Sequence, residues 1–205
     1  MILKADQIAK RLVPSEEDID PLVIVPKPNI ELLKQAGEAS VDLRLGTWFL
    51  TLRQARLTHL SVANKDASYE DDIKFARTHY IPFGKEFILH PRSFVLGVTL
   101  EWVRMAGDLA GYVIGKSSWG RRGLIIATAT GVHPGFTGCL TLELSNIGEI
   151  PIAIKPGIKI CQLFIHDVKS ETKTLSASCF VGRRKPTLGR IVIDELAQKL
   201  SEELD

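Results

Sequence analysis

Five residues that can hold an anion lie within seven positions of one glycine-rich stretch, GYVIGKSSWGRRG at 111–123. They are Lys116, Ser117, Ser118, Arg121 and Arg122. P-loop nucleotide hydrolases also place Gly-Lys-Ser beside phosphates, but their motif has four residues between its two glycines. Here Gly111 and Gly115 enclose only three residues. A P-loop is also followed by a helix, and the two glycines of WGRRG make that stretch a poor first helical turn. The stretch therefore predicts an anion-binding loop that is not a P-loop.

A second candidate is the carboxylate in LTLELS, residues 140–145. Leucines at alternate positions predict a strand whose other face carries Thr141, Glu143 and Ser145. Two interpretations of Glu143 stay open: a solvated side chain on an exposed sheet, or a carboxylate lining a cleft, where burial raises its pKa and lets it transfer protons. Just upstream, TATGVHPGFTG at 128–138 predicts a glycine-rich hairpin, either an ordinary turn or a close approach for a flat ligand.

Gln162 lies in an apolar run, where alternation places it on the face of Ile158, Ile160 and Phe164. An unpaired amide on such a face would cost about 1–3 kcal/mol. Bonds within the fold and contact with a ligand explain this residue equally well.

Metal and serine-hydrolase chemistry have no sequence support. Zinc nucleobase deaminases need His-x-Glu and Pro-Cys-x-x-Cys. Neither His133 nor His166 begins a His-x-Glu, and the three cysteines, at 139, 161 and 179, form no Cys-x-x-Cys pair. A Gly-x-Ser-x-Gly nucleophile elbow is also absent from the sequence. We expect no catalytic metal.

The elements that must position these residues are short strands separated by turns. The alternation begins in SVDLRL at residue 40, and strand-like runs follow at 47–52, 86–89, 93–99, 109–114, 138–144, 150–155 and 158–166. Such a series indicates an all-β barrel or sandwich. Short helices are expected at 1–12, 29–36 and 193–200, an irregular crossing at 13–30, and a polar loop or insertion at 60–78.

The composition suits a soluble globular chain, with 45% apolar and 24% charged residues among 205. A net charge of +2 is too small to indicate nucleic-acid binding, and basic clusters at 121–122 and 183–185 are more often solvated surface. Neither a secretory signal nor an apolar run of about 18 residues is present, so we expect no membrane association. Three cysteines without framework spacing predict reduced thiols in a cytoplasmic protein.

In combination, GKSSWGRRGL, HPGFTGCLTLELSN and PIAIKPGIKICQLF resemble motifs of the dCTP deaminase branch of the dUTPase-like superfamily. The similarity extends through SVDLRLG and LHPRSFVLGVTLEWV and covers residues 1–168 in order, with a weaker match in the tail. It implies a distorted β-barrel (a dUTPase-like β-clip) with short peripheral helices at both termini, and homotrimers with active sites between subunits. One domain would span 1–205: an N-terminal arm (1–38), a β core (40–168), and a C-terminal lid and helix (169–205).

The resemblance also implies a reaction, the metal-independent hydrolysis of dCTP to dUTP and ammonia, with Mg²⁺ accompanying the triphosphate. By position, Glu143 corresponds to the proton-transferring glutamate, Ser117 to the serine that holds water, and Arg121 to the arginine beside the reacting centre. The implied substrate-binding residues are Lys116, Ser118, Trp119, Gly120, His133, Thr141, Leu142, Gln162 and Arg183. The backbone of 128–132 would read the cytosine edge.

Three departures from the family pattern keep alternatives open. His133 replaces an aspartate that is implicated where family members also cleave triphosphates, Cys179 replaces a lid lysine, and Lys116 replaces an arginine and so gives up bidentate geometry. The alternatives are a bifunctional dCTP deaminase and dUTP diphosphatase that forms dUMP, and a nucleotide-binding regulator without catalysis.

Overall fold

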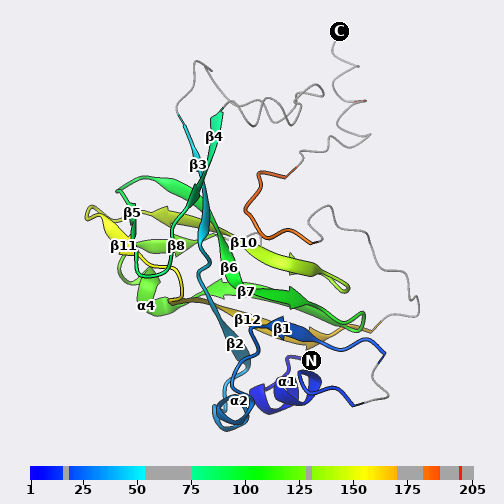
Figure 1. The fold of residues 1–205 in the computed structure, drawn as a ribbon. Helices are drawn as coiled ribbons and strands as arrows, with labels where there is room; N and C mark the ends of the chain where they lie inside the picture. Colours follow the sequence, from blue (N-terminus) through cyan, green and yellow to red (C-terminus); the bar gives the residue numbers. More distant parts are fainter. Residues whose placement is uncertain (16–18, 54–74, 128–130, 170–181, 190–198, 200–205) are drawn as a thin grey trace.

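The computed structural model describes residues 1–15, 19–53, 75–127, 131–169, 182–189 and 199. Strands dominate this part of the chain, which confirms the all-β prediction (Figure 1). The strands are β1 (Val23–Val25), β2 (Ser40–Arg44), β3 (Trp48–Leu52), β4 (Ala76–Tyr80), β5 (Phe87–Leu89), β6 (Phe94–Arg104), β7 (Leu109–Gly115), β8 (Leu124–Ile126), β9 (Gly131–Val132), β10 (Thr137–Asn146), β11 (Ile152–Ile154) and β12 (Lys159–Asp167). The helices are α1 (Ala5–Arg11), α2 (Ile30–Gln35) and α4 (Ser117–Gly120).

The described strands form three sheets around one core. The largest has the order β4-β3-β6-β10-β8, with β1 also paired to β6; the second is β2-β12-β7-β9, and the third is the pair β11-β5. An isolated bridge between Leu45 and Thr99 joins the first two sheets. The predicted distorted barrel thus takes the form of separate sheets that share their buried side chains.

A buried carboxylate fastens the same junction between sheets. Glu101 of β6 is only 1% exposed, and its two oxygens accept hydrogen bonds from the backbone N–H (2.7 Å) and the guanidinium (2.8 Å) of Arg44 in β2. A buried charge needs such partners, because burial without them is costly. This arrangement fixes β2, and the polar side chains on it, relative to the large sheet.

The alternation predicted for β10 is confirmed. Its even-numbered residues from Gly138 to Asn146 are buried, and its odd-numbered residues are half-buried. One irregularity interrupts its pairing with β6 between Cys139 and Thr141. The backbone N–H of Leu140 at that point donates to the hydroxyl of Thr99 (2.9 Å), so the amide released by the irregularity is satisfied.

Strand β12 differs from its prediction because it contains a bulge. Lys159 pairs with Arg44 but Cys161 pairs with Leu43, so two steps along β12 match one step along β2. Ile160 and Cys161 are consequently both fully buried. The expectation that Gln162 shares a face with Ile160 is therefore wrong, since the bulge shifts the alternation between them.

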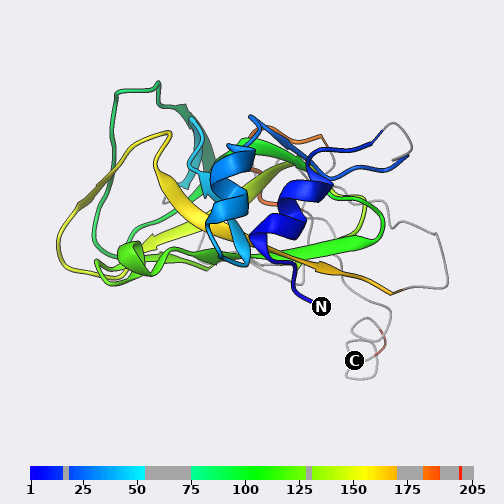
Figure 2. The same cartoon turned by 90° about the horizontal axis from the view of Figure 1, so that it is seen from below.

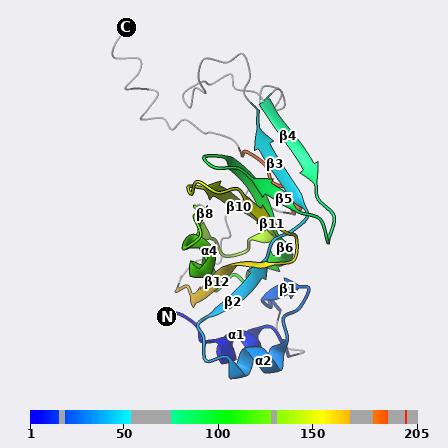
Figure 3. The same ribbon diagram turned by 90° about the vertical axis from the view of Figure 1, so that its left-hand side faces the viewer.

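The two N-terminal helices were predicted correctly and lie side by side (Figure 2), at one end of the molecule (Figure 1). Helix α1 buries Ala5, Ile8 and Ala9. Asn29 caps the N-terminus of helix α2, and its side chain accepts the N–H of Leu32 (3.1 Å). The hairpin of β3 and β4 extends at the opposite end (Figure 3). Of the polar loop predicted at 60–78, the last residues belong instead to β4.

The remaining expectations concern the segment at 13–30, the C-terminal region, the cysteines and membrane association. The irregular crossing at 13–30 contains the strand β1, which the prediction missed. Most of the predicted helix at 193–200 and most of the lid lie outside the described residues, as does Cys179. Cys139 and Cys161 are free thiols, as predicted. Within the described residues, no helix is long and apolar enough to cross a bilayer.

Candidate functional site

The predicted anion-binding loop follows β7 directly and forms the single helical turn α4. The carbonyl of Lys116 accepts the N–H groups of Trp119 (3.0 Å) and Gly120 (3.2 Å). This turn lies before most of WGRRG, the stretch that the sequence predicts to be a poor first helical turn. The helix stops at Gly120, and Gly123 adopts a φ of +88°, which favours glycine.

This loop presents polar side chains to solvent. Ser117, Ser118 and Arg121 are exposed, and their side chains make no hydrogen bond or ion pair with another residue in the described ranges. Arg122 folds back instead, and its guanidinium donates to the carbonyl of Ser118 (2.7 Å). The two hydroxyls and the Arg121 guanidinium are thus available to a ligand.

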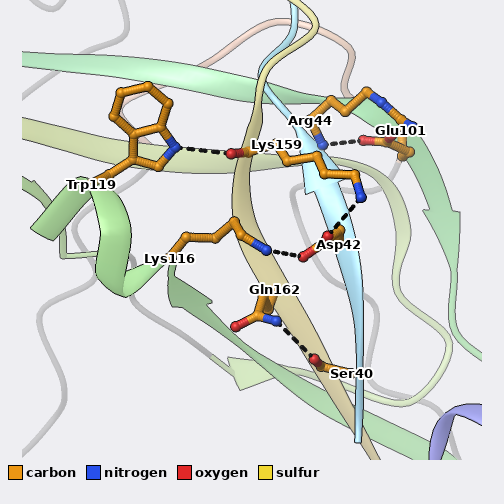
Figure 4. Close-up of polar contacts among 8 residues, drawn as sticks. All are labelled: Ser40, Asp42, Arg44, Glu101, Lys116, Trp119, Lys159 and Gln162. Atoms are coloured by element: carbon orange, nitrogen blue, oxygen red, sulfur yellow. Dashed lines mark hydrogen bonds and ion pairs between the residues drawn. The ribbon is translucent and has the colours of Figure 1, made fainter. Parts of the chain in front are cut away.

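One carboxylate holds two lysines beside the loop (Figure 4). The ammonium of Lys116 lies 2.5 Å from Oδ1 of Asp42, and that of Lys159 lies 3.0 Å from Oδ2. Asp42 comes from the middle of β2, and Lys159 begins β12. Two positive charges against one negative charge leave the cluster with a net charge of +1.

The electrostatics of Asp42 follow from this geometry. Burial alone would raise the pKa of the Asp42 carboxyl, but hydrogen bonds and charges from Lys116 and Lys159 outweigh burial and hold that pKa below its ordinary value of 3.8. Asp42 is therefore ionised at neutral pH.

Two further bonds fasten the loop to β12. The indole N–H of Trp119 donates to the carbonyl of Lys159 (2.9 Å), and the backbone N–H of Lys116 donates to the carbonyl of Ile160 (3.1 Å). Trp119 was expected to bind substrate, but its polar group is already used by the fold. Its half-buried ring packs against the core.

Gln162 finds its partner within the fold. The Gln162 amide donates to the hydroxyl of Ser40 (3.2 Å), a residue of β2 (Figure 4). In the ladder Gln162 pairs with Asp42 on one side and with Ile114 on the other. A structural bond thus accounts for its nitrogen, and its amide lies in the same stretch of β2 and β12 as the Asp42 cluster.

The residues around Glu143 lie on the other large sheet. Glu143 and Thr141 are half-buried on one face of β10, whereas the side chain of Leu142 is fully buried in the core. Leu142 can therefore contribute only its backbone to a ligand site.

No other residue in the described ranges forms a hydrogen bond or ion pair with the Glu143 carboxylate. The Glu143 backbone is held by the N–H of Ala127 (3.0 Å), beyond the end of β8. A half-buried carboxylate without a partner within the described chain is one that a ligand or another subunit can approach.

The remaining predicted residues lie near the start of β10. His133 is exposed, between β9 and β10. Arg183 is also exposed, and its carbonyl accepts the N–H of Cys139 (2.8 Å). The two residues after it belong to the basic cluster at 183–185, for which the sequence favours solvated surface. Arg184 lines a cavity of about 320 Å³ with Trp48 and Trp102, and the ammonium of Lys185 lies 4.0 Å from the centre of the Trp48 ring.

The structure thus brings the predicted residues together as two groups. The loop and Gln162 meet around Asp42, and Glu143, Thr141 and Arg183 lie on or beside β10. Within the described part of one chain, no hydrogen bond or ion pair joins the groups. Asp42 and Lys159 were missed; the only sequence signal for them was a charged residue in the SVDLRLG stretch and one in the PGIKICQLF stretch.

No three His, Cys, Asp or Glu side chains gather closely enough to hold an ion in the ranges that the structure describes.

A family model described as dCTP deaminase-like matches residues 2–168 of this sequence. The chain belongs to the dCTP deaminase-like family. The resemblance drawn from its motifs is thereby confirmed, and the family match ends just after β12.

Relatives within the dCTP deaminase-like family match most of the chain. The dCTP deaminase of Halorubrum lacusprofundi is 40% identical over 176 residues, which cover 84% of this chain and 80% of that protein. The dCTP deaminase of Dictyoglomus thermophilum described as dUMP-forming is 39% identical over 166 residues, 78% of this chain and 83% of that one.

A solved structure supports the fold. The crystal structure of 2'-deoxycytidine 5'-triphosphate deaminase from Agrobacterium tumefaciens superposes with a TM-score of 0.56 at 20% identity. The superposition covers 80% of this chain but only 46% of the other, so the chain spans less than half the length of that protein.

Proposed function

We propose that this protein deaminates dCTP by hydrolysis, releasing dUTP and ammonia, without a catalytic metal. The observation that carries the proposal is Glu143, a half-buried carboxylate in mid-strand with no partner in the described chain. Family membership and dCTP deaminases at about 40% identity support the choice of reaction.

The reaction assigns a distinct task to each of three residues. Glu143 takes one proton from water, whose oxygen adds to C4 of the cytosine ring, and gives that proton to the ring nitrogen. Glu143 then takes the remaining proton from the new C4 hydroxyl and gives it to the amino group. The bond between C4 and the amino nitrogen breaks, ammonia leaves, and the C4=O of uracil forms. The hydroxyl of Ser117 holds the attacking water, and the charge of Arg121 keeps Glu143 ionised and oriented.

The substrate is the magnesium complex of dCTP, and its triphosphate would lie at the loop. Lys116 and Ser118 supply charge and a hydroxyl there, with Gly120, Trp119 and Gln162 shaping the surroundings. The sugar and base would lie along β10 and its hairpin, where Thr141, His133, Arg183 and the backbone of Leu142 are placed.

The two groups of residues meet when subunits associate. Ser117 and Arg121 have no partner within the described chain, and neither does Glu143. We propose a homotrimer of single-domain chains in which the loop of one subunit faces Glu143 of the next. Each active site then contains all three catalytic residues.

We assign dUTP as the final product because His133 replaces the aspartate of members that continue to dUMP. A neutral imidazole does not supply that charge. Relatives at 39–40% identity are described both as dCTP deaminases and as dUMP-forming, so the product has to be measured directly.

The test is product analysis with dCTP and magnesium, following ammonia, dUTP, dUMP and pyrophosphate in one reaction. We expect equal amounts of ammonia and dUTP and no pyrophosphate. Pyrophosphate with dUMP would make the enzyme bifunctional. Binding of dCTP with no product would indicate a regulator instead of an enzyme.

A further inference from the structure

We propose that Lys159 is a second triphosphate-binding cation, which Asp42 holds next to Lys116 until substrate arrives. This inference rests on the proposed function, because it assigns the triphosphate to the loop that precedes and includes α4. Lys159 was not among the residues predicted from the sequence motifs.

The Asp42 carboxylate has two lysine partners, and Lys159 is the second of them. Asp42 already has one close partner in Lys116, at 2.5 Å, and Lys159 lies on the other oxygen at 3.0 Å. The side chains of Asp42 and Lys116 are 19% and 27% exposed, whereas that of Lys159 is 56% exposed. The carboxylate is covered, and the second lysine faces solvent.

The backbone of Lys159 is fixed to the loop itself. Its carbonyl accepts the indole N–H of Trp119, and the next carbonyl, of Ile160, accepts the N–H of Lys116. The start of β12 and the loop therefore form one unit. An anion bound by Ser117 or Ser118 would lie on the same unit as the Lys159 side chain.

The chemistry of lysine suits an exchange of partners. An ammonium on a flexible stem can turn from one anion to another, and an ion pair with a half-exposed lysine contributes little to stability. A triphosphate carries far more negative charge than a single carboxylate. Lys159 would leave Asp42 for the phosphate, while Lys116 would stay beside Asp42 and keep it neutralised as it also faces the triphosphate.

The variant that tests this is Lys159→Met, with Lys155→Met as a matched control. Lys155 also pairs with a carboxylate at 3.0 Å, that of Glu86, and its side chain is 52% exposed. Both variants lose one positive charge and one similar ion pair. Only Lys159 lies beside the loop.

The measurements are KM and kcat for dCTP, and calorimetric affinities for dCTP, dCMP and inorganic tripolyphosphate, on variants checked for wild-type melting temperature. For Lys159→Met we expect KM for dCTP and both triphosphate dissociation constants to rise about tenfold. The value of kcat and the dCMP affinity should stay within about twofold of wild type. Lys155→Met should match wild type throughout, and Lys159→Arg should recover most of the loss.

Three results would overturn the assignment: wild-type tripolyphosphate affinity in Lys159→Met, an equal loss in Lys155→Met, or an equal loss of dCMP affinity. The binding data also separate this inference from the proposed function. A chain that turns over no dCTP refutes the deaminase proposal, while a selective tripolyphosphate defect in Lys159→Met would still support the phosphate role. A wild-type chain that binds neither dCTP nor tripolyphosphate refutes both.

Discussion

The indole N–H of Trp119 donates a 2.9 Å hydrogen bond to the backbone carbonyl of Lys159, across 40 residues of sequence. This bond joins α4 to the start of β12 and so fixes the loop that carries Ser117 and Arg121. The loop position is therefore set by strand β12 as well as by the strand that precedes it.

Replacing Trp119 by Phe keeps an aromatic ring but removes this bond and part of the ring surface that packs against the core. We expect the free energy of unfolding to fall by at least about 0.5–1.5 kcal/mol, the usual contribution of one hydrogen bond, because some burial is lost as well. The KM for dCTP should rise, because the residues that we propose bind the triphosphate lose a fixed support. Urea denaturation and steady-state kinetics measure the two effects. Unchanged stability together with unchanged KM would show that the bond does not hold the loop.

Glu143→Gln should abolish ammonia release and leave dCTP binding intact. An amide keeps the shape of the side chain but cannot accept and return a proton, so kcat should fall at least about 1,000-fold. Ammonia release and calorimetric dCTP binding are the two measurements. Glu149→Gln, at an exposed position outside β10, is the control and should behave as wild type. Wild-type turnover in Glu143→Gln would eliminate the proposed mechanism.

Substitutions at two neighbouring residues of β10 should have different effects, one on the stability of the fold and the other on dCTP binding. Leu142 is fully buried, so Leu142→Ala should lower the free energy of unfolding by about 2–5 kcal/mol through lost burial and a cavity. Thr141 is half-buried on the opposite face, and Thr141→Val keeps its shape, so stability should change by less than about 1 kcal/mol. In the proposed site, Thr141→Val should weaken dCTP binding. Denaturation and calorimetry of both variants provide the comparison; equal destabilisation would contradict the assigned faces.

The contribution of Asp42 to the free energy of unfolding should depend on pH in the acid range. Its pKa in the folded protein lies below the ordinary 3.8, so its contribution is fully present above about pH 3.8 and is lost as pH falls through the folded pKa. The difference in free energy of unfolding between wild type and Asp42→Asn should be largest at neutral pH and should shrink below about pH 3.8. Urea denaturation across this pH range at constant ionic strength measures it. Asp167→Asn, at an exposed carboxylate, should show no comparable difference. A difference for Asp42→Asn that is independent of pH would rule out the ion pairs as its origin.

Local sequence determined much of this protein. Alternation predicted β10 and the burial of Leu142 and Leu144, because the side-chain period of a strand is visible in any apolar and polar pattern. The capping residue Asn29 and the turn at Gly37 likewise fixed helix α2 from within a few residues. The motifs also pointed to the family, since several in the same order are more specific than any one.

Tertiary structure decided what depends on residues far apart in the chain. The bulge at Ile160 follows from the pairing of β12 with β2, and no alternation within β12 reveals it. Strands β1 and β8 are three residues long and exist because β6 and β10 pair with them. Lys116 and Asp42, 74 residues apart, become partners only when β7 and β2 both pair with β12. Periodicity is a local property of the chain, whereas register and charge pairing are set by how the sheets assemble.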